Sequence, residues 1–218
     1  MFSLSEENYL KAIFHLEQTY KEGVSTNALA EEMETKASSV TDMVKKLSEK
    51  KLVIYKKYQG VKLSKLGRDA AIEIIRKHRL WEVFLVEKLN FNWDEVHDVA
   101  EQLEHIHSEK LINELDKFLG FPKRDPHGDP IPDSAGNFIA SNKTLLADLV
   151  IGDSGICVGV KDSSAAFLQF LDKNHISLGK EIKVLEKEDF DKSMLIDLQG
   201  NELRISSLIS ENLYIKIS

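Results

Sequence analysis

The sequence has little of what marks secreted or membrane proteins. Its single cysteine, Cys157, excludes a disulfide within the chain, as is typical of a reducing compartment. No apolar run approaches the ~20 residues needed to span a bilayer. The first residues also lack the basic segment and continuous apolar core of a signal peptide. We therefore expect a cytoplasmic protein with no membrane partner. A hydrophobic content of 42% with 30% charged residues indicates a folded protein rather than a disordered one.

Positive charge clearly exceeds negative charge in one segment of an otherwise acidic chain. The chain has a net charge of −7, but residues 36 to 68 contain ten Lys or Arg and only two acids, Asp42 and Glu49. A basic segment inside an acidic protein indicates polyanion binding at one place. The alternative is a solvated helix face followed by a lysine-rich edge strand.

The basic segment lies within a pattern typical of a winged helix-turn-helix. A first helix is expected over residues 5–21, with Ser5 as its N-cap and Gly23 ending it. Two short helices follow, one capped by Ser25 and one bearing Val40, Val44 and Leu47. Strands over 52–58 and 61–67 would then form a hairpin, which is the wing.

The rest of the chain is helical and then β-rich. We expect a long helix over 65–89, a second over 96–110, a third over 110–120, and a loop over 121–136 that holds all four prolines. From about residue 145, short β-rich runs predict a small barrel. The fold class is therefore mainly α with a small β domain.

The winged pattern predicts DNA binding. The second helix of the pair enters the major groove in such folds, and the wing follows the phosphate backbone. The alternative is a winged fold used only for protein contacts. The candidate DNA-binding residues are Lys36, Ser38, Ser39, Thr41, Asp42, Lys45, Lys46, Lys56, Lys57 and Tyr58.

A second pattern combines histidine with carboxylate. Residues 96–110 contain three histidines and four carboxylates. On a helix, His97, Glu101, Glu104 and His105 share one face that carries no Lys or Arg, opposite an apolar side. His78 and Glu82 lie four residues apart on the preceding helix. Imidazole and carboxylate without thiolate favour Mn²⁺ or Fe²⁺. The alternative is an ordinary amphipathic helix with a solvated face.

Enzyme activity is not expected. Glu104 and His107 have the Glu-x-x-His spacing of di-iron bundles, but such bundles need two of these motifs on four long helices. No activated nucleophile, phosphate-binding glycine loop or dinucleotide motif is present. Two alternatives stay open at this point: a metal-storage or ferroxidase-like helical protein, and a winged-helix regulator of a small organic ligand with a structural His/Glu face.

Three motifs give the chain a family resemblance. RKHRLWE, VHDVAEQLEH and PHGDPIP, in this order and spacing, resemble the diphtheria-toxin-repressor and manganese-transport-regulator family of metal-dependent transcriptional repressors. The resemblance covers essentially the whole chain. It implies a winged helix-turn-helix domain over 1–71, a helical metal-binding and dimerisation domain over 72–140, and an SH3-like (FeoA-like) β-barrel over 145–218.

The resemblance also implies two metal sites per chain. His78, Glu82 and His97 match the ancillary site, and Arg79 matches an arginine that holds an anion beside it. Glu101, Glu104 and His105 match the primary site, with Asn8 at the position of a further ligand from the first helix. In some members the proline-rich turn and the last domain complete the second site, which nominates Asp125, His127 and Asp162 beside Glu82; the alternative is that Asp125 and His127 are solvated turn residues.

Four departures bear on the metal. Iron sensors have cysteine at the position of Glu101, so glutamate there favours Mn²⁺. Manganese sensors usually have Asp at Asn8 and Glu at Lys11, which argues against a two-manganese cluster. His97 belongs to the iron-type ancillary site, while the Glu and Gln that iron-type barrels donate are missing around residues 163–167. The function implied is a homodimeric repressor of metal-uptake genes, activated by Mn²⁺ or Fe²⁺ and bound to a palindromic double-stranded operator.

Overall fold

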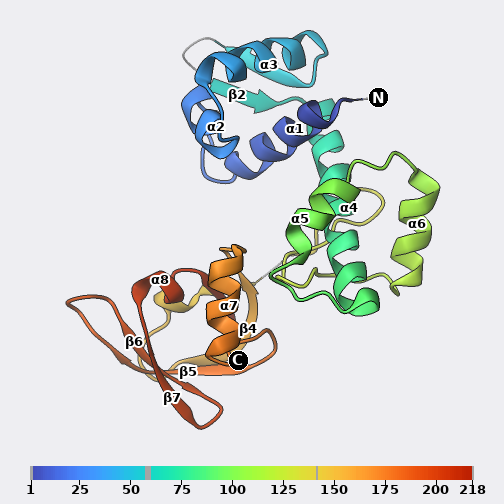
Figure 1. Ribbon diagram of the computed structural model, residues 1–218. Helices are drawn as coiled ribbons and strands as arrows, with labels where there is room; N and C mark the ends of the chain where they lie inside the picture. Colours follow the sequence, from blue (N-terminus) through green and yellow to red (C-terminus); the bar gives the residue numbers. More distant parts are fainter. Residues whose placement is uncertain (1, 57–59, 141, 218) are drawn as a thin grey trace. The chain divides into compact units, whose positions relative to one another are not determined.

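The computed structural model describes residues 2–56, 60–140 and 142–217 (Figure 1). The helices are α1 (Leu4–Leu16), α2 (Thr26–Glu32), α3 (Ala37–Glu49), α4 (Lys65–Leu89), α5 (Val96–Leu103), α6 (Glu109–Phe118), α7 (Ala165–Lys173) and α8 (Ser207–Ser210). The strands are β1 (Val53–Lys56), β2 (Gly60–Leu63), β3 (Thr144–Leu145), β4 (Ser154–Val160), β5 (Glu181–Lys187), β6 (Met194–Leu198), β7 (Asn201–Ile205) and β8 (Leu213–Ile217).

Residue contacts divide the chain into two compact units, and the division passes within α4, α5 and α6. The first unit contains Met1–His78, Glu101–Asn113 and Pro132–Asn137. The second contains Arg79–Ala100, Glu114–Ile131 and Phe138–Ser218. The domain boundaries expected from the sequence stay predictions.

The first unit contains the winged helix-turn-helix that the sequence predicts. β1 and β2 pair antiparallel, with Val53 opposite Leu63, and Val24 forms a bridge with Val61 beside them. Gly60 has φ +85°, and a Cβ there would lie 2.8 Å from the Val24 carbonyl oxygen, so the wing needs glycine at this point. The core of this region comes from α1, α2, α3 and the hairpin, and it includes Leu10, Ile13, Leu29, Val40, Val44, Leu47 and Val61.

Helix α1 begins earlier and ends earlier than expected. Its N-cap is Ser3 rather than Ser5, because Ser3 and Glu6 form a capping box. The Glu6 amide donates to Ser3 Oγ at 3.3 Å, and the Ser3 amide donates to Glu6 Oε2 at 3.0 Å. These two bonds satisfy donors that a start at Ser5 would leave unpaired.

The central helices confirm one expectation and correct another. α4 spans Lys65–Leu89, as predicted. α5 ends at Leu103 rather than continuing to residue 110, since the Ile106 amide bonds back to the Leu103 carbonyl in a tight turn. Ile106, which a helix continued to residue 110 would place on the apolar side, is exposed. None of the helices in the described ranges is both long and apolar enough to cross a membrane.

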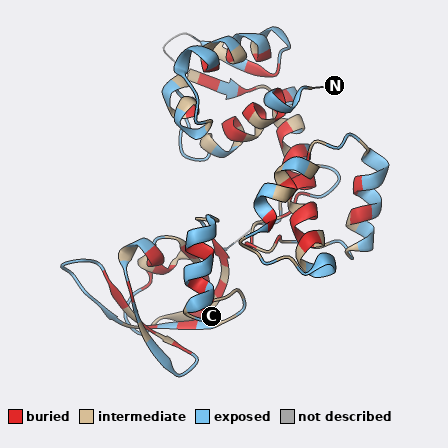
Figure 2. Cartoon of the chain, viewed as in Figure 1, coloured by how far each residue is buried: buried red, intermediate tan, exposed pale blue. Residues whose placement is uncertain are grey.

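The C-terminal part of the second unit contains an antiparallel sheet in the order β3-β8-β4-β5-β6-β7. Its pairing shifts register between Cys157 and Gly159 and between Val184 and Glu186. Helix α7, which the sequence analysis did not predict, contributes Phe167, Leu168 and Leu171 to the same core while its other side is exposed (Figure 2). The fold class, mainly α with a small β domain, is confirmed.

Candidate metal centre

Three buried side chains of the second unit form a group with metal-ligand chemistry. Glu82 comes from α4, while Asp125 and His127 come from the proline-rich loop after α6. Their exposed fractions are 2%, 7% and 4%, so this loop segment is not a solvated turn. One ligand atom from each lies within 4.8 Å of the others, and His127 Nδ1 is 3.5 Å from Glu82 Oε1.

The loop is held so that His127 presents Nδ1 to this group. Asp125 Oδ1 accepts hydrogen bonds from the amides of His127 and Asp129, both at 2.9 Å. His127 Nε2 lies 2.7 Å from the Trp93 carbonyl oxygen, to which it donates. Metal-binding histidines usually donate their other ring N–H to a carbonyl or carboxylate, so this hydrogen bond is compatible with Nδ1 as a ligand atom.

The electrostatics of the group favour a cation. Burial and the neighbouring Glu82 carboxylate raise the pKa of Asp125 to about 7, although Arg79 opposes the shift. Burial lowers the pKa of His127, but the hydrogen bond and charge of Glu82 raise it further, to about 9. Two buried carboxylates and an imidazole in this arrangement fit a divalent cation of the Mn²⁺ or Fe²⁺ kind.

Arg79 contacts anions that the chain itself supplies. Its Nε is 3.3 Å from Asp125 Oδ2, its Nη1 donates to the Pro130 carbonyl at 2.6 Å, and its Nη2 is 3.4 Å from Asp129 Oδ2. The binding of an external anion by Arg79 stays a prediction.

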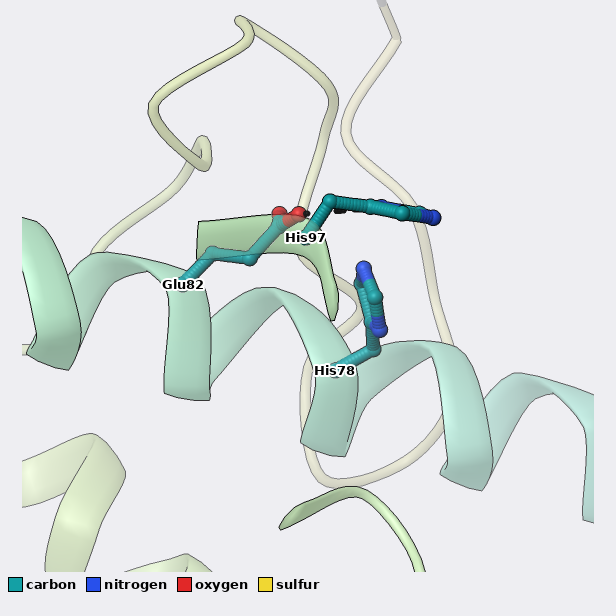
Figure 3. Close-up of side chains that lie close together, drawn as sticks. All are labelled: His78, Glu82 and His97. Atoms are coloured by element: carbon teal, nitrogen blue, oxygen red, sulfur yellow. Dashed lines mark ion pairs between the residues drawn. The ribbon is translucent and has the colours of Figure 1, made fainter. Parts of the chain in front are cut away.

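Glu82 also belongs to a second group. Figure 3 shows Glu82 and His78, one turn apart on α4, together with His97 of α5. Their ligand atoms lie within 4.8 Å, and His97 Nδ1 is 3.6 Å from Glu82 Oε1. His97 is 46% exposed, so this group is more open to solvent than the first. Asp162 belongs to neither group among the described residues; its Oδ1 accepts from the Ser164 amide at 2.8 Å.

The predicted primary site lies in the first unit and brings together a different set of residues. Glu101 and Glu104 form a possible ligand group with His78, whose Nδ1 is 2.6 Å from Glu104 Oε2. His105 lies beside them, with Nε2 3.9 Å from Glu104 Oε1. Its Nδ1 is 2.5 Å from Glu7 Oε2. Asn8 Oδ1 is buried and has no hydrogen-bond partner among the described residues, as expected of an oxygen that awaits a ligand.

Lys11 of α1 contacts the same two carboxylates. Its Nζ forms an ion pair with Glu101 and lies 2.8 Å and 2.9 Å from the two oxygens of Glu104. Burial raises the pKa of Glu104, but the His78 hydrogen bond and the Lys11 charge together lower it below its usual value. The Asn8 oxygen thus suits a metal ligand, whereas the positive charge of Lys11 opposes the binding of a metal at Glu101 and Glu104.

The predicted DNA-binding residues lie on the exposed side of α3 and on β1. Lys36 is the N-cap of α3, and Ser38, Ser39, Asp42, Lys45 and Lys46 are exposed along it, as is Lys56 at the end of β1. Thr41 is half-buried, and its hydroxyl donates to the Ala37 carbonyl at 2.8 Å. Lys45 pairs with Asp42 at 3.5 Å and Lys46 with Glu6 at 3.1 Å. Lys57 and Tyr58 lie outside the described residues.

Comparison with known proteins assigns the chain to a protein family. Residues 1–61 match the iron-dependent repressor N-terminal DNA-binding domain, 64–133 the iron-dependent repressor metal-binding and dimerisation domain, and 144–217 the FeoA domain. A solved manganese-dependent transcriptional repressor in complex with manganese is 34% identical, with a TM-score of 0.90 over 98% of this chain and 100% of that one. The chain belongs to the diphtheria-toxin-repressor family.

Curated relatives in this family include iron regulators. The iron-dependent repressor IdeR of Mycobacterium leprae is 36% identical over 128 residues, which are 58% of this chain and 54% of that protein. The match therefore spans about half the length of that relative. The diphtheria toxin repressor of Corynebacterium diphtheriae is 29% identical over 202 residues, 91% of this chain and 83% of that protein. Membership of this family does not favour a regulator of a small organic ligand.

Two residues of α1, Glu7 and Lys11, contact the predicted primary site but were not among the predicted ligands. Glu7 is 2% exposed and contacts His105; its Oε1 also lies 3.5 Å from His107 Nε2, although the sequence analysis gave His107 no ligand role. Lys11 was noted only as a departure from the manganese branch of the family. Glu7 and Lys11 are four residues apart on one helix face, and this spacing beside Asn8 is the signal that could have grouped them.

Proposed function

We propose that this chain is a DNA-binding transcriptional repressor of metal-uptake genes whose binding to DNA depends on Mn²⁺ or Fe²⁺. The proposal rests on the family, on an exposed helix α3 with cationic side chains, and on the buried group of Glu82, Asp125 and His127. That group is the observation that carries the metal dependence. Burial of two adjacent carboxylates is costly unless positive charge compensates it, and a divalent cation would add to the compensation that Arg79 gives Asp125 and His127 gives Glu82.

The donor set supports Mn²⁺ over softer metals. Carboxylate oxygens and imidazole suit Mn²⁺ and Fe²⁺, whereas thiolate selects Zn²⁺ or Cu⁺. The one cysteine, Cys157, lies buried in the core of the C-terminal sheet, and burial raises the pKa of its thiol to about 11. We propose Glu82, Asp125 and His127 for one site, with Asp162 and the neighbours His78 and His97 as further candidates. Glu101, Glu104, His105 and Asn8 are proposed for the other.

Helix α1 is the proposed coupling element because it contacts both functional parts of the first unit. Glu6 accepts from Lys50 of the α3 C-terminus at 2.7 Å and pairs with Lys46. One residue on, Glu7 contacts His105, and Lys11 contacts Glu101 and Glu104. A divalent cation supplies two positive charges to the carboxylates of residues 101–105 when bound. A change in the contacts of Glu7 or Lys11 would then reach α3 through the rigid turns of α1.

The remaining parts of the proposal concern assembly and place. A homodimer is proposed because residues 64–133 match a dimerisation domain, and a two-fold dimer fits a palindromic operator. We also propose a cytoplasmic location, which suits a DNA-binding regulator.

The test is DNA binding with and without metal. Duplexes are selected from a random library with full-length protein in Mn²⁺, and the enriched duplex is titrated by fluorescence anisotropy in Mn²⁺ or in chelator. We expect tight binding in Mn²⁺ and weak binding in chelator, with symmetric half-sites in the enriched sequence. Equal binding in the two conditions would refute metal dependence, and no enrichment would refute sequence-specific DNA binding. The Glu82→Gln variant is expected to need more Mn²⁺, while Glu87→Gln, on the same helix, is the matched control.

A further inference from the structure

Lys11 contacts both carboxylates of the predicted primary site, Glu101 and Glu104. Its side chain is only 13% exposed, and Glu104 is fully buried. Both Glu104 oxygens accept from Lys11, and one of them also contacts His78. The carboxylate oxygens that a divalent cation would need are thus already bound to a positive charge that belongs to the chain.

Electrostatic repulsion makes it unfavourable for two cations to bind these oxygens at the same time. An ammonium and a divalent ion beside Glu101 and Glu104 would give three positive charges against two negative ones, next to a fully buried Glu104. The ammonium must leave before a divalent ion can take the same oxygens. Its hydrogen bonds to charged groups are then lost, and that loss lowers the apparent metal affinity.

A cavity beside Lys11 can accept its side chain when the ammonium leaves Glu101 and Glu104. This cavity of about 300 Å³ in the first unit is lined by Lys11, Asn8 and Glu101 and also by residues of α2 and its C-terminal turn. Glu32 and Glu34 are among those residues, and both are exposed acids. A lysine side chain is flexible and its ammonium strongly hydrated, so it can exchange one pair of carboxylates for another.

We propose that Lys11 is a tethered competitor for the metal: it neutralises Glu101 and Glu104 when no metal is bound, and leaves them for the cavity beside Glu32 and Glu34 when a divalent cation binds. Lys11 therefore sets the metal concentration at which this site fills. It also carries the change from residues 101–104 to the α2 side of the winged helix. This inference deepens the proposed function and rests on it.

The test measures Mn²⁺ affinity at this site alone. Full-length protein carrying Glu82→Gln, which disables the Glu82 group, is stripped with chelator and titrated with Mn²⁺, and free Mn²⁺ is followed by electron paramagnetic resonance. Adding Lys11→Met is expected to tighten binding by about 10- to 100-fold, the worth of a hydrogen bond to a charged group. Lys11→Arg keeps the positive charge and is expected to bind as weakly as the parent. Lys21→Met, at an exposed position after the C-terminal end of α1, is the control and leaves the affinity unchanged.

A second readout separates this role from a merely structural one. In chelator, Lys11→Met is expected to melt at a lower temperature than the parent, because Glu101 and Glu104 lose their counter-charge; Mn²⁺ is expected to restore the melting temperature. Lys11→Gln, which keeps a hydrogen-bond donor, serves if Lys11→Met does not fold.

The outcomes separate the two proposals. Unchanged or weaker Mn²⁺ binding after Lys11→Met, or no Mn²⁺ binding at this site with either residue at position 11, overturns the role of Lys11 and leaves the proposed function standing. If the unmodified chain binds no Mn²⁺ at all, the proposed function fails and the inference fails with it.

Discussion

The Nε2 atom of His127 lies 2.7 Å from the Trp93 carbonyl oxygen, and the Trp93 and His127 rings stack at a centroid distance of 6.3 Å. Trp93 also packs against the core of the C-terminal sheet, and its Nε1 donates to Asp172 of α7 at 2.9 Å. One tryptophan therefore touches a candidate ligand and the sheet domain of the same unit.

Trp93 should report metal binding at the Glu82 group. Mn²⁺ is paramagnetic and quenches nearby indole emission, so titration with Mn²⁺ is expected to lower the intrinsic fluorescence. Trp93→Phe keeps the backbone carbonyl that orients His127 but removes the reporter, and should abolish most of the change. Trp81→Phe is the control and should retain it. Quenching that survives Trp93→Phe would place the responsive site elsewhere.

Asp125→Asn should separate stability from metal binding. The folded-state pKa of Asp125, about 7, lies above the ordinary 3.8, so its contribution to stability falls as pH rises between these values. At pH 8 in chelator, the asparagine chain should therefore resist urea at least as well as the parent, because its amide oxygen can still accept from the amides of His127 and Asp129. Its Mn²⁺ affinity by calorimetry should fall. A lower urea midpoint at pH 8 would contradict the assignment of a costly buried charge.

Glu6 gives a pH dependence of the opposite sign. Burial raises its pKa, but hydrogen bonds from Lys50, Ser3 and Lys46 lower it to about 2, below the ordinary 4.5. The stability that Glu6 contributes is fully present above pH 4.5 and is lost as pH falls towards 2. Glu6→Gln should cost about 1–2 kcal/mol of unfolding free energy at pH 7, discounted because both lysines are half-exposed, and almost nothing near pH 2. Urea unfolding across this range is the measurement. Glu49→Gln, on the exposed side of α3, should show no such trend.

Replacement of Gly128 by alanine should destabilise the protein far more than the same replacement at Gly179, whose backbone conformation is similar. Its φ is +88°, and a Cβ there would overlap the Val158 carbonyl oxygen of β4. Gly128→Ala should therefore destabilise the chain by about 3 kcal/mol or more. Gly179 has φ +85° with nothing within 4 Å of the added atom, so Gly179→Ala should cost only the backbone penalty of about 1–2 kcal/mol. Equal losses in thermal unfolding would show that close approach to β4 is unimportant.

Lys45 should contribute to DNA affinity without contributing to sequence choice. It is exposed on α3, and its pair with Asp42 is a surface pair of little strength. Lys45→Gln should weaken binding to the selected and to scrambled duplexes alike, and should reduce the slope of log affinity against log salt by about 1. Lys173→Gln, at the end of α7, is the control. An unchanged salt slope would mean that Lys45 contacts no phosphate.

Local patterns predicted α4 well because its own residues decide it. Its apolar positions repeat at helical spacing from Lys65, and the chain leaves the helix at Asn90, whose φ of +58° is left-handed. The C-terminal sheet was expected for a similar reason, since its strands alternate between buried and exposed residues. α7 was missed because it is short and lies between β-rich runs.

The end of α5 could not be read from its own sequence. The periodicity continues past Leu103, but Glu104 contacts Lys11, 93 residues away in the chain. The same limit applies to Asp125 and His127. The prolines around them predict a loop, and only the folded chain brings that loop to Glu82. Residue types revealed the chemistry of the candidate site, whereas its pairing depends on contacts between distant segments.

The close approach of Gly128 to β4 also affects the position of a candidate metal ligand. The Val160 amide of β4 donates to the His127 carbonyl at 3.0 Å, so the backbone of the C-terminal sheet supports the residue that presents Nδ1 to Glu82. A chain shortened to residues 1–140 would keep Glu82, Asp125 and His127 and lose that support. Removal of the C-terminal sheet is therefore expected to lower the Mn²⁺ affinity of the Glu82 group even though these three residues remain.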